Sequence, residues 1–138
     1  MTRRVVVPEV VRLSLTEGDW IEVKMELTYG EACTIRQQMI TGIRPPNAQQ
    51  PSMGYDLDIG AWERATVEAY LVDWSIKGLD DKVIDISSES KKRSALRNVI
   101  TQETFAEIHE AISQHKERVA NAKKPMEIGA PTSAPISG

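Results

Sequence analysis

A strand pattern and a helix start follow one another directly in the stretch Trp20-Ile-Glu-Val-Lys-Met-Glu-Leu-Thr-Tyr-Gly-Glu31. Over its first eight residues, charged or polarisable side chains alternate with the apolar Ile21, Val23, Met25 and Leu27. This period of two predicts a β-strand that buries one face. Thr28 and Glu31 then have the spacing of a capping box, which predicts a helix over residues 29–41.

The residues before this stretch predict a partner strand. Val11, Leu13 and Leu15 alternate with polar side chains, and Glu17-Gly-Asp19 has the composition of a turn. Together the two segments predict an antiparallel β-hairpin over residues 10–27. Because an isolated hairpin is only marginally stable in water, its apolar face must pack against the rest of the chain.

The residues after the stretch predict a loop and further helices. Glycines and prolines are concentrated between Gly42 and Gly54, which is typical of a loop. Apolar side chains at helical spacing predict helices over residues 56–74, 91–98 and 102–122, with Thr101 as the N-cap of the last one. Val83-Ile-Asp-Ile86 is open to two interpretations, a short strand or the apolar anchor of a loop.

The chain has 138 residues, which corresponds to about one domain. The predicted fold class is α+β, an N-terminal antiparallel β-hairpin packed on a small bundle of three to four helices, with an extended C-terminal tail. We expect an N-terminal arm over residues 1–9, a single domain over 10–124 and a proline-rich tail over 125–138 that is flexible or bound to a partner. The residues that we expect in the core are Val23, Met25, Ile35, Trp62, Leu71, Phe105, Ile108 and Ile112.

Nothing in the sequence has the pattern of a catalytic, cofactor or metal site. The single cysteine, Cys33, has no histidine near it in the sequence that could activate the thiol. His109 and His115 are both in the last predicted helix, but six residues of helix place them about 120° apart. Asp80, Asp81 and Asp85 lack the spacing of a calcium loop and fit turns better. We therefore expect a protein that is not an enzyme and that needs no cofactor.

Two features are candidates for partner binding. Lys91, Lys92 and Arg93 form the clearest basic cluster, which fits either a solvated helix start or a contact with an acidic partner. Nucleic acid is disfavoured, because the net charge is −3 and no aromatic residues are interleaved with these cations. Trp20 is on the charged face of its strand, where it either contacts a partner or covers the hairpin against a helix. No apolar run approaches the length of a membrane span.

The order of the predicted elements resembles small proteins from the structural gene clusters of tailed bacteriophages, above all the tail assembly chaperones of long-tailed phages. The resemblance covers residues 10–120. It is carried by four segments, namely Glu17-Gly-Asp-Trp-Ile-Glu-Val23, Leu27-Thr-Tyr-Gly-Glu31, Ala69-Tyr-Leu-Val-Asp-Trp74 and Thr104-Phe-Ala-Glu-Ile-His-Glu-Ala-Ile112. These are apolar patterns, so no individual functional residue is carried over.

The resemblance implies a non-enzymatic protein that binds the tape-measure protein and helps tail-tube subunits to polymerise around it. Such a protein acts in the host cytoplasm during assembly, and a homo-oligomer is a further expectation. The alternative is a permanent component of the virion, such as a head–tail connector or a minor capsid-associated protein. In that case neighbouring subunits would hold the C-terminal arm in place.

Overall fold

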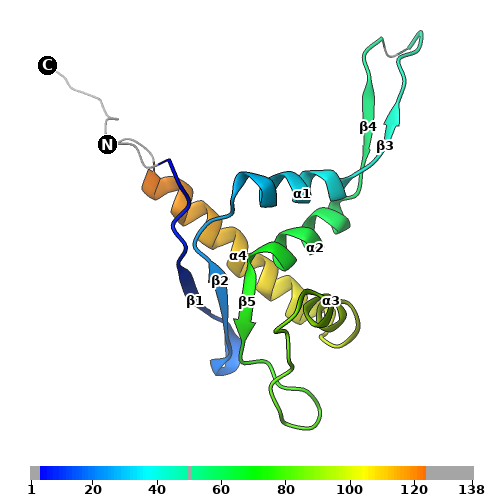
Figure 1. Ribbon diagram of the computed structural model, residues 1–138. Coiled ribbons are helices and arrows are strands. Elements are labelled where there is room, and N and C mark those ends of the chain that lie inside the picture. Colours follow the sequence, from blue (N-terminus) through cyan, green and yellow to red (C-terminus); the bar gives the residue numbers. More distant parts are fainter. Residues whose placement is uncertain (1–3, 50, 124–138) are drawn as a thin grey trace, which may run out of the picture.

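The computed structural model describes residues 4–49 and 51–123 and contains two antiparallel sheets and four α-helices in that part of the chain (Figure 1). The larger sheet has the strand order β1 (Val10–Ser14), β2 (Trp20–Lys24) and β5 (Leu71–Trp74), and the smaller one pairs β3 (Ile40–Arg44) with β4 (Gly54–Leu57). The helices are α1 (Tyr29–Met39), α2 (Ile59–Tyr70), α3 (Glu89–Asn98) and α4 (Gln102–Lys123). The predicted α+β class, with a hairpin packed on helices, is confirmed.

The N-terminal hairpin has the predicted pairing. Val11 lies opposite Val23 and Leu13 lies opposite Ile21, so their side chains share the buried face. A single 3₁₀ turn, Thr16–Gly18, reverses the chain, and Gly18 has the positive φ of 81° that favours glycine. The second strand ends at Lys24, earlier than predicted.

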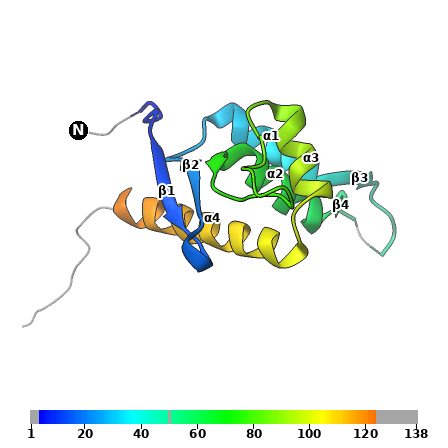
Figure 2. The same ribbon diagram turned by 90° about the horizontal axis from the view of Figure 1, so that it is seen from below.

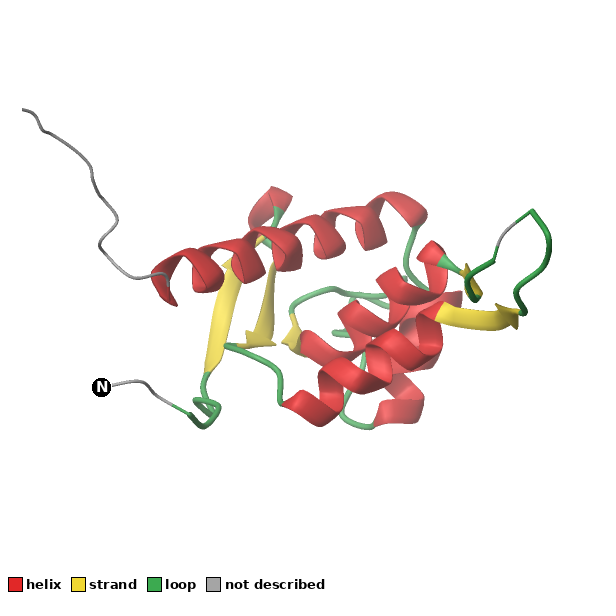
Figure 3. Ribbon diagram, turned by 90° about the horizontal axis from the view of Figure 1, so that it is seen from above, coloured by secondary structure: helices red, strands yellow, loops and turns green. Residues whose placement is uncertain are grey.

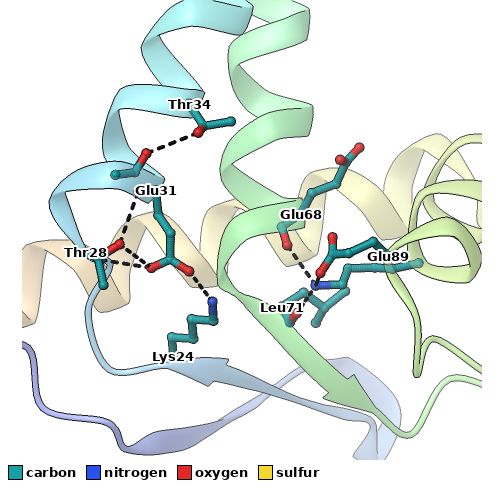
Figure 4. Close-up of polar contacts among 9 residues, drawn as sticks. Lys24, Thr28, Glu31, Thr34, Glu68, Leu71 and Glu89 are labelled. Atoms are coloured by element: carbon teal, nitrogen blue, oxygen red, sulfur yellow. Dashed lines mark hydrogen bonds and ion pairs between the residues drawn. The ribbon is translucent and has the colours of Figure 1, made fainter.

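The start of α1 is the predicted capping box. The Thr28 hydroxyl accepts a hydrogen bond from the Glu31 backbone N–H at 3.2 Å, and the Glu31 carboxylate accepts one from the Thr28 backbone N–H at 2.9 Å. Lys24 of β2 forms an ion pair with the same carboxylate, so the cap also ties the helix to the sheet (Figure 4). The cap therefore defines the start of α1, and the ion pair holds that start beside β2.

Two predictions about the middle of the chain are wrong. The helix predicted over 56–74 ends at Tyr70, and the next residues form β5 along the second edge of β2. Trp74 and Leu71 are almost completely buried in this strand, which a solvent-exposed continuation of the helix would not achieve. The loop predicted over 42–54 contains strand residues at both ends, and β3 begins directly after Met39.

The junction between α2 and β5 is closed by a lysine from α3. The ammonium of Lys92 donates hydrogen bonds to the carbonyl oxygens of Glu68, at 2.8 Å, and of Leu71, at 2.6 Å (Figure 4). These carbonyls are at the end of a helix, where no further backbone N–H follows to bind them. Burial lowers the pKa of Lys92, and the nearby carboxylate of Glu89, at 3.6 Å, opposes this effect.

The segment 83–86 serves as a loop anchor. Val83 makes one isolated bridge with Lys77, and Ile86 is buried in the core. The indole N–H of Trp74 donates to the carbonyl of Ile84 at 2.9 Å. The strand alternative is therefore limited to a single bridge.

The core lies where α4 crosses the larger sheet and α2 (Figures 2 and 3). The residues of the predicted core that are buried are Val23, Ile35, Leu71, Ile108 and Ile112. Met25, Trp62 and Phe105 are only half-buried, because they lie at the margin of the packed region. The N-cap of α4 is Thr101, as predicted, since its hydroxyl accepts from the Thr104 backbone N–H at 3.1 Å.

The two predicted terminal segments are described only in part. In the N-terminal arm, Val7 donates its backbone N–H to the Glu26 carboxylate at 3.0 Å, and the Glu9 carbonyl accepts from Met25 at 2.8 Å. These contacts extend the pairing of the hairpin beyond β1. The predicted tail over 125–138 lies outside the described residues.

We expect Ile108→Ala to lower the free energy of unfolding by about 2–5 kcal/mol, because the side chain is fully buried between the sheet and the helices. Val99→Ala is the matched control, since that side chain is largely exposed and its truncation should cost about 0.5 kcal/mol or less. Urea denaturation followed by tryptophan fluorescence measures both. Equal losses for the two variants would contradict the proposed core.

We expect Lys92→Met to lower the free energy of unfolding by about 1–3 kcal/mol, because the carbonyls of Glu68 and Leu71 lose their donor. Lys91→Met is the control on the same helix, since Lys91 forms only an exposed ion pair with Asp85. Such pairs contribute little to stability. Thermal melting by circular dichroism compares the two, and an unchanged melting temperature for Lys92→Met would contradict the role of this side chain.

Candidate interaction surface

The β3–β4 hairpin, named here the arm, projects away from the body of the molecule (Figure 1). It is joined to the body through α1 at one end and α2 at the other. The Asp58 backbone N–H donates to the Met39 carbonyl at 2.8 Å and closes the base of the arm. A two-stranded ribbon of this kind is only marginally stable by itself. Packing of its side chains against another surface would stabilise it.

A β-bulge brings the apolar residues of the arm onto one face. Tyr55 and Leu57 are two residues apart on β4 and therefore share a face. Ile43 lies opposite Tyr55, and Ile40 lies opposite Leu57, although their spacing of three residues would separate them in a regular strand. Thr41 is the additional residue that corrects this spacing, and its hydroxyl donates to the Asp56 carbonyl at 3.2 Å.

All four side chains of this apolar face are exposed. The exposed fractions are 40% for Ile40, 62% for Ile43, 48% for Tyr55 and 55% for Leu57. Ile59, the first residue of α2, continues the exposed apolar surface along the chain at the base of the arm. Contiguous apolar surface of this kind is typical of a site that binds another protein.

The sequence pattern does not predict the arm as a candidate site. The prolines and glycines from Gly42 to Gly54 predict a loop, but only the prolines lie in the tip, since Gly42 is in β3 and Gly54 is in β4. The alternation in Tyr55-Asp-Leu57 is a strand signal, but it is too short to outweigh the helix pattern that follows. Only the pairing of β3 with β4 in the structure shows that this segment is a strand.

Trp20 lies on the charged face of β2, as predicted, but it is not fully exposed. The guanidinium of Arg12 on β1 lies over its ring, with the central carbon 3.7 Å from the ring centroid. Arg12 is held there by the carboxylate of Glu22, at 2.9 Å. The ring is thus covered in part by a neighbouring strand, and its role in partner binding stays a prediction.

The basic cluster is not one surface. Lys92 is 7% exposed and binds backbone carbonyls, so its assignment to an exposed patch is wrong. Lys91 pairs with Asp85 at 2.7 Å, and this hydrogen bond holds the pKa of the carboxyl well below its usual range. Arg93 is within 3.4 Å of the Glu68 carboxylate. The two exposed cations are therefore already paired within the chain.

The two histidines of α4 have different surroundings. His115 is buried, and its Nε2 donates toward the carbonyls of Lys24 and Met25, at 3.1 and 3.0 Å. His109 packs edge-on against Trp62, with the ring centroids 5.5 Å apart. In residues 4–49 and 51–123, no group of three or more histidine, cysteine or acidic side chains could hold a metal ion.

The described helices include none that is both long and apolar enough to cross a membrane.

Comparisons of the chain with protein-family models, with curated proteins and with solved structures found no match. The apolar face of the arm is thus identified as the candidate interaction surface by its geometry and exposure.

Proposed function

We propose that this chain is a non-enzymatic assembly protein of a tailed bacteriophage, of the tail assembly chaperone kind. It binds the tape-measure and tail-tube proteins while the tail is being built in the host cytoplasm. The observation that carries the proposal is the arm, which presents Ile40, Ile43 and Leu57 on one face beyond the body of the domain.

The arm is suited to reversible binding of another structural protein. Its apolar face gains stability when a partner covers it, at about 25 cal/mol for each Å² of apolar surface removed from water. In the part of the chain that the structure describes, β3 pairs with β4 alone, so each strand also has an edge that a partner strand can extend. Neither burial of the apolar face nor addition of a partner strand needs a catalytic side chain, so both fit a non-enzymatic protein.

The alternative is a permanent component of the virion, such as a head–tail connector or a minor capsid-associated protein. The projection of the arm also supports this function, because an arm that reaches beyond its own domain suits lasting contacts between neighbouring subunits. The two functions differ in whether the protein stays in the finished particle.

We expect the double variant Ile43→Thr/Leu57→Thr to reduce the recovery of co-expressed tape-measure or tail-tube protein by about tenfold, since it removes two apolar contacts but keeps β-forming residues. Leu79→Thr is the control, because Leu79 is a fully exposed leucine outside the arm. The measurement is affinity purification of the tagged chain with quantitative mass spectrometry, after thermal melts have established that all variants fold.

Mass spectrometry of purified particles then distinguishes the two functions. A tail assembly chaperone should be absent from the particles, whereas a virion component should be present at a fixed copy number. If the unaltered chain recovers neither tape-measure nor tail-tube protein and is absent from particles, the proposed function is wrong.

A further inference from the structure

A groove of about 450 Å³ runs over α2, between α1 and α4. Figure 2 shows the three helices in this order, with α2 in the middle. The floor is a row of side chains four residues apart on α2, namely Trp62, Thr66 and Tyr70. The walls come from α1 with Ala32, Ile35 and Arg36, and from α4 with Lys116, Val119, Ala120 and Lys123.

The dimensions of the groove suit a helix. The row from Trp62 to Tyr70 extends over eight residues of α2, which is about 12 Å at 1.5 Å per residue. That length corresponds to about two turns of a helix lying along the groove. Helices bind in such grooves by placing apolar side chains at helical spacing against the floor.

Two apolar side chains of the lining are incompletely covered, whereas Thr66 and Tyr70 on the floor are buried. Trp62 and Val119 are half-buried, while Ile35 beside them is buried. The Trp62 ring also packs against His109, whose Nε2 is buried with no hydrogen-bond partner in the described part of the chain. A buried polar atom of this kind costs stability, and such costs are concentrated at functional sites.

The rim of the groove is positively charged. Arg36 on α1 and Lys116 on α4 lie on opposite walls, and neither forms an ion pair with any residue of 4–49 or 51–123. The Lys116 ammonium is 5.4 Å from the centroid of the Trp62 ring, so it lies above the apolar floor. Lys123, at the end of the groove, is instead paired with Glu26.

We propose that this groove binds a helical segment of another protein whose apolar side chains cover Trp62 and Val119 and whose carboxylates pair with Arg36 and Lys116. The two cations on opposite walls call for acidic residues on both flanks of the bound helix, so charge complementarity defines the partner as an acidic amphipathic helix. This inference goes beyond the proposed function and does not rest on it, because the groove and the arm consist of different residues.

The probe is a fluorescent synthetic helix of about 14 residues with leucines at helical spacing and glutamates on both flanks, and its twin carries lysine in place of every glutamate. Fluorescence anisotropy measures the dissociation constants. We expect the acidic peptide to bind at least about tenfold more tightly than its twin, and Arg36→Glu/Lys116→Glu to weaken its binding by about tenfold or more. Arg118→Glu is the matched control on the exposed side of α4 and should change the affinity by less than about threefold.

Several results would overturn the proposal. The acidic peptide failing to bind, the two peptides binding equally, or Arg118→Glu weakening binding as much as the double variant would each exclude specific recognition by the groove. A dimer of the unaltered chain that Arg36→Glu/Lys116→Glu dissociates in analytical ultracentrifugation would identify a second copy as the occupant instead. Binding of the acidic peptide by Ile43→Thr/Leu57→Thr should remain unchanged, so failure of the groove and failure of the arm are distinguishable.

Discussion

The ammonium of Lys92 holds together the point at which α2 becomes β5, and the larger sheet depends on that junction. No residue separates Tyr70, the end of the helix, from Leu71, the start of the strand. The helix-end carbonyls would face the core without a donor if the lysine were absent. Because β5 completes the second edge of β2, this one cation links α3, α2 and the sheet.

The elements that local signals define were predictable from the sequence. The hairpin follows from strict alternation around Ile21 and Val23, and α1 follows from the reciprocal cap of Thr28 and Glu31. The strand β5 was not predictable in this way, because its residues continue the helical spacing of α2. Pairing with β2 overrides that local preference, and a contact between residues so distant in the sequence leaves no local signal.

The candidate surfaces depended even more on tertiary structure. Lys91 and Lys92 are neighbours of the same charge, and only the packing of α3 against α2 makes one of them a buried donor and the other an exposed ion pair. The groove likewise requires Arg36 and Lys116 to face each other from separate helices. For the arm, the prolines of the tip predicted a loop, although the short strands on either side of the tip pair with each other.

The bulge at Thr41 affects the direction of the arm without changing which side chains form its apolar face. Cross-strand pairing determines which side chains form the apolar face, whereas a bulge bends and twists a ribbon and so determines its direction. Loss of this single residue would leave a regular ladder in which Ile40 and Ile43 still share a face, but the arm would leave the body at a different angle. A one-residue change in chain length could therefore redirect the arm during evolution without altering the chemistry of its apolar face.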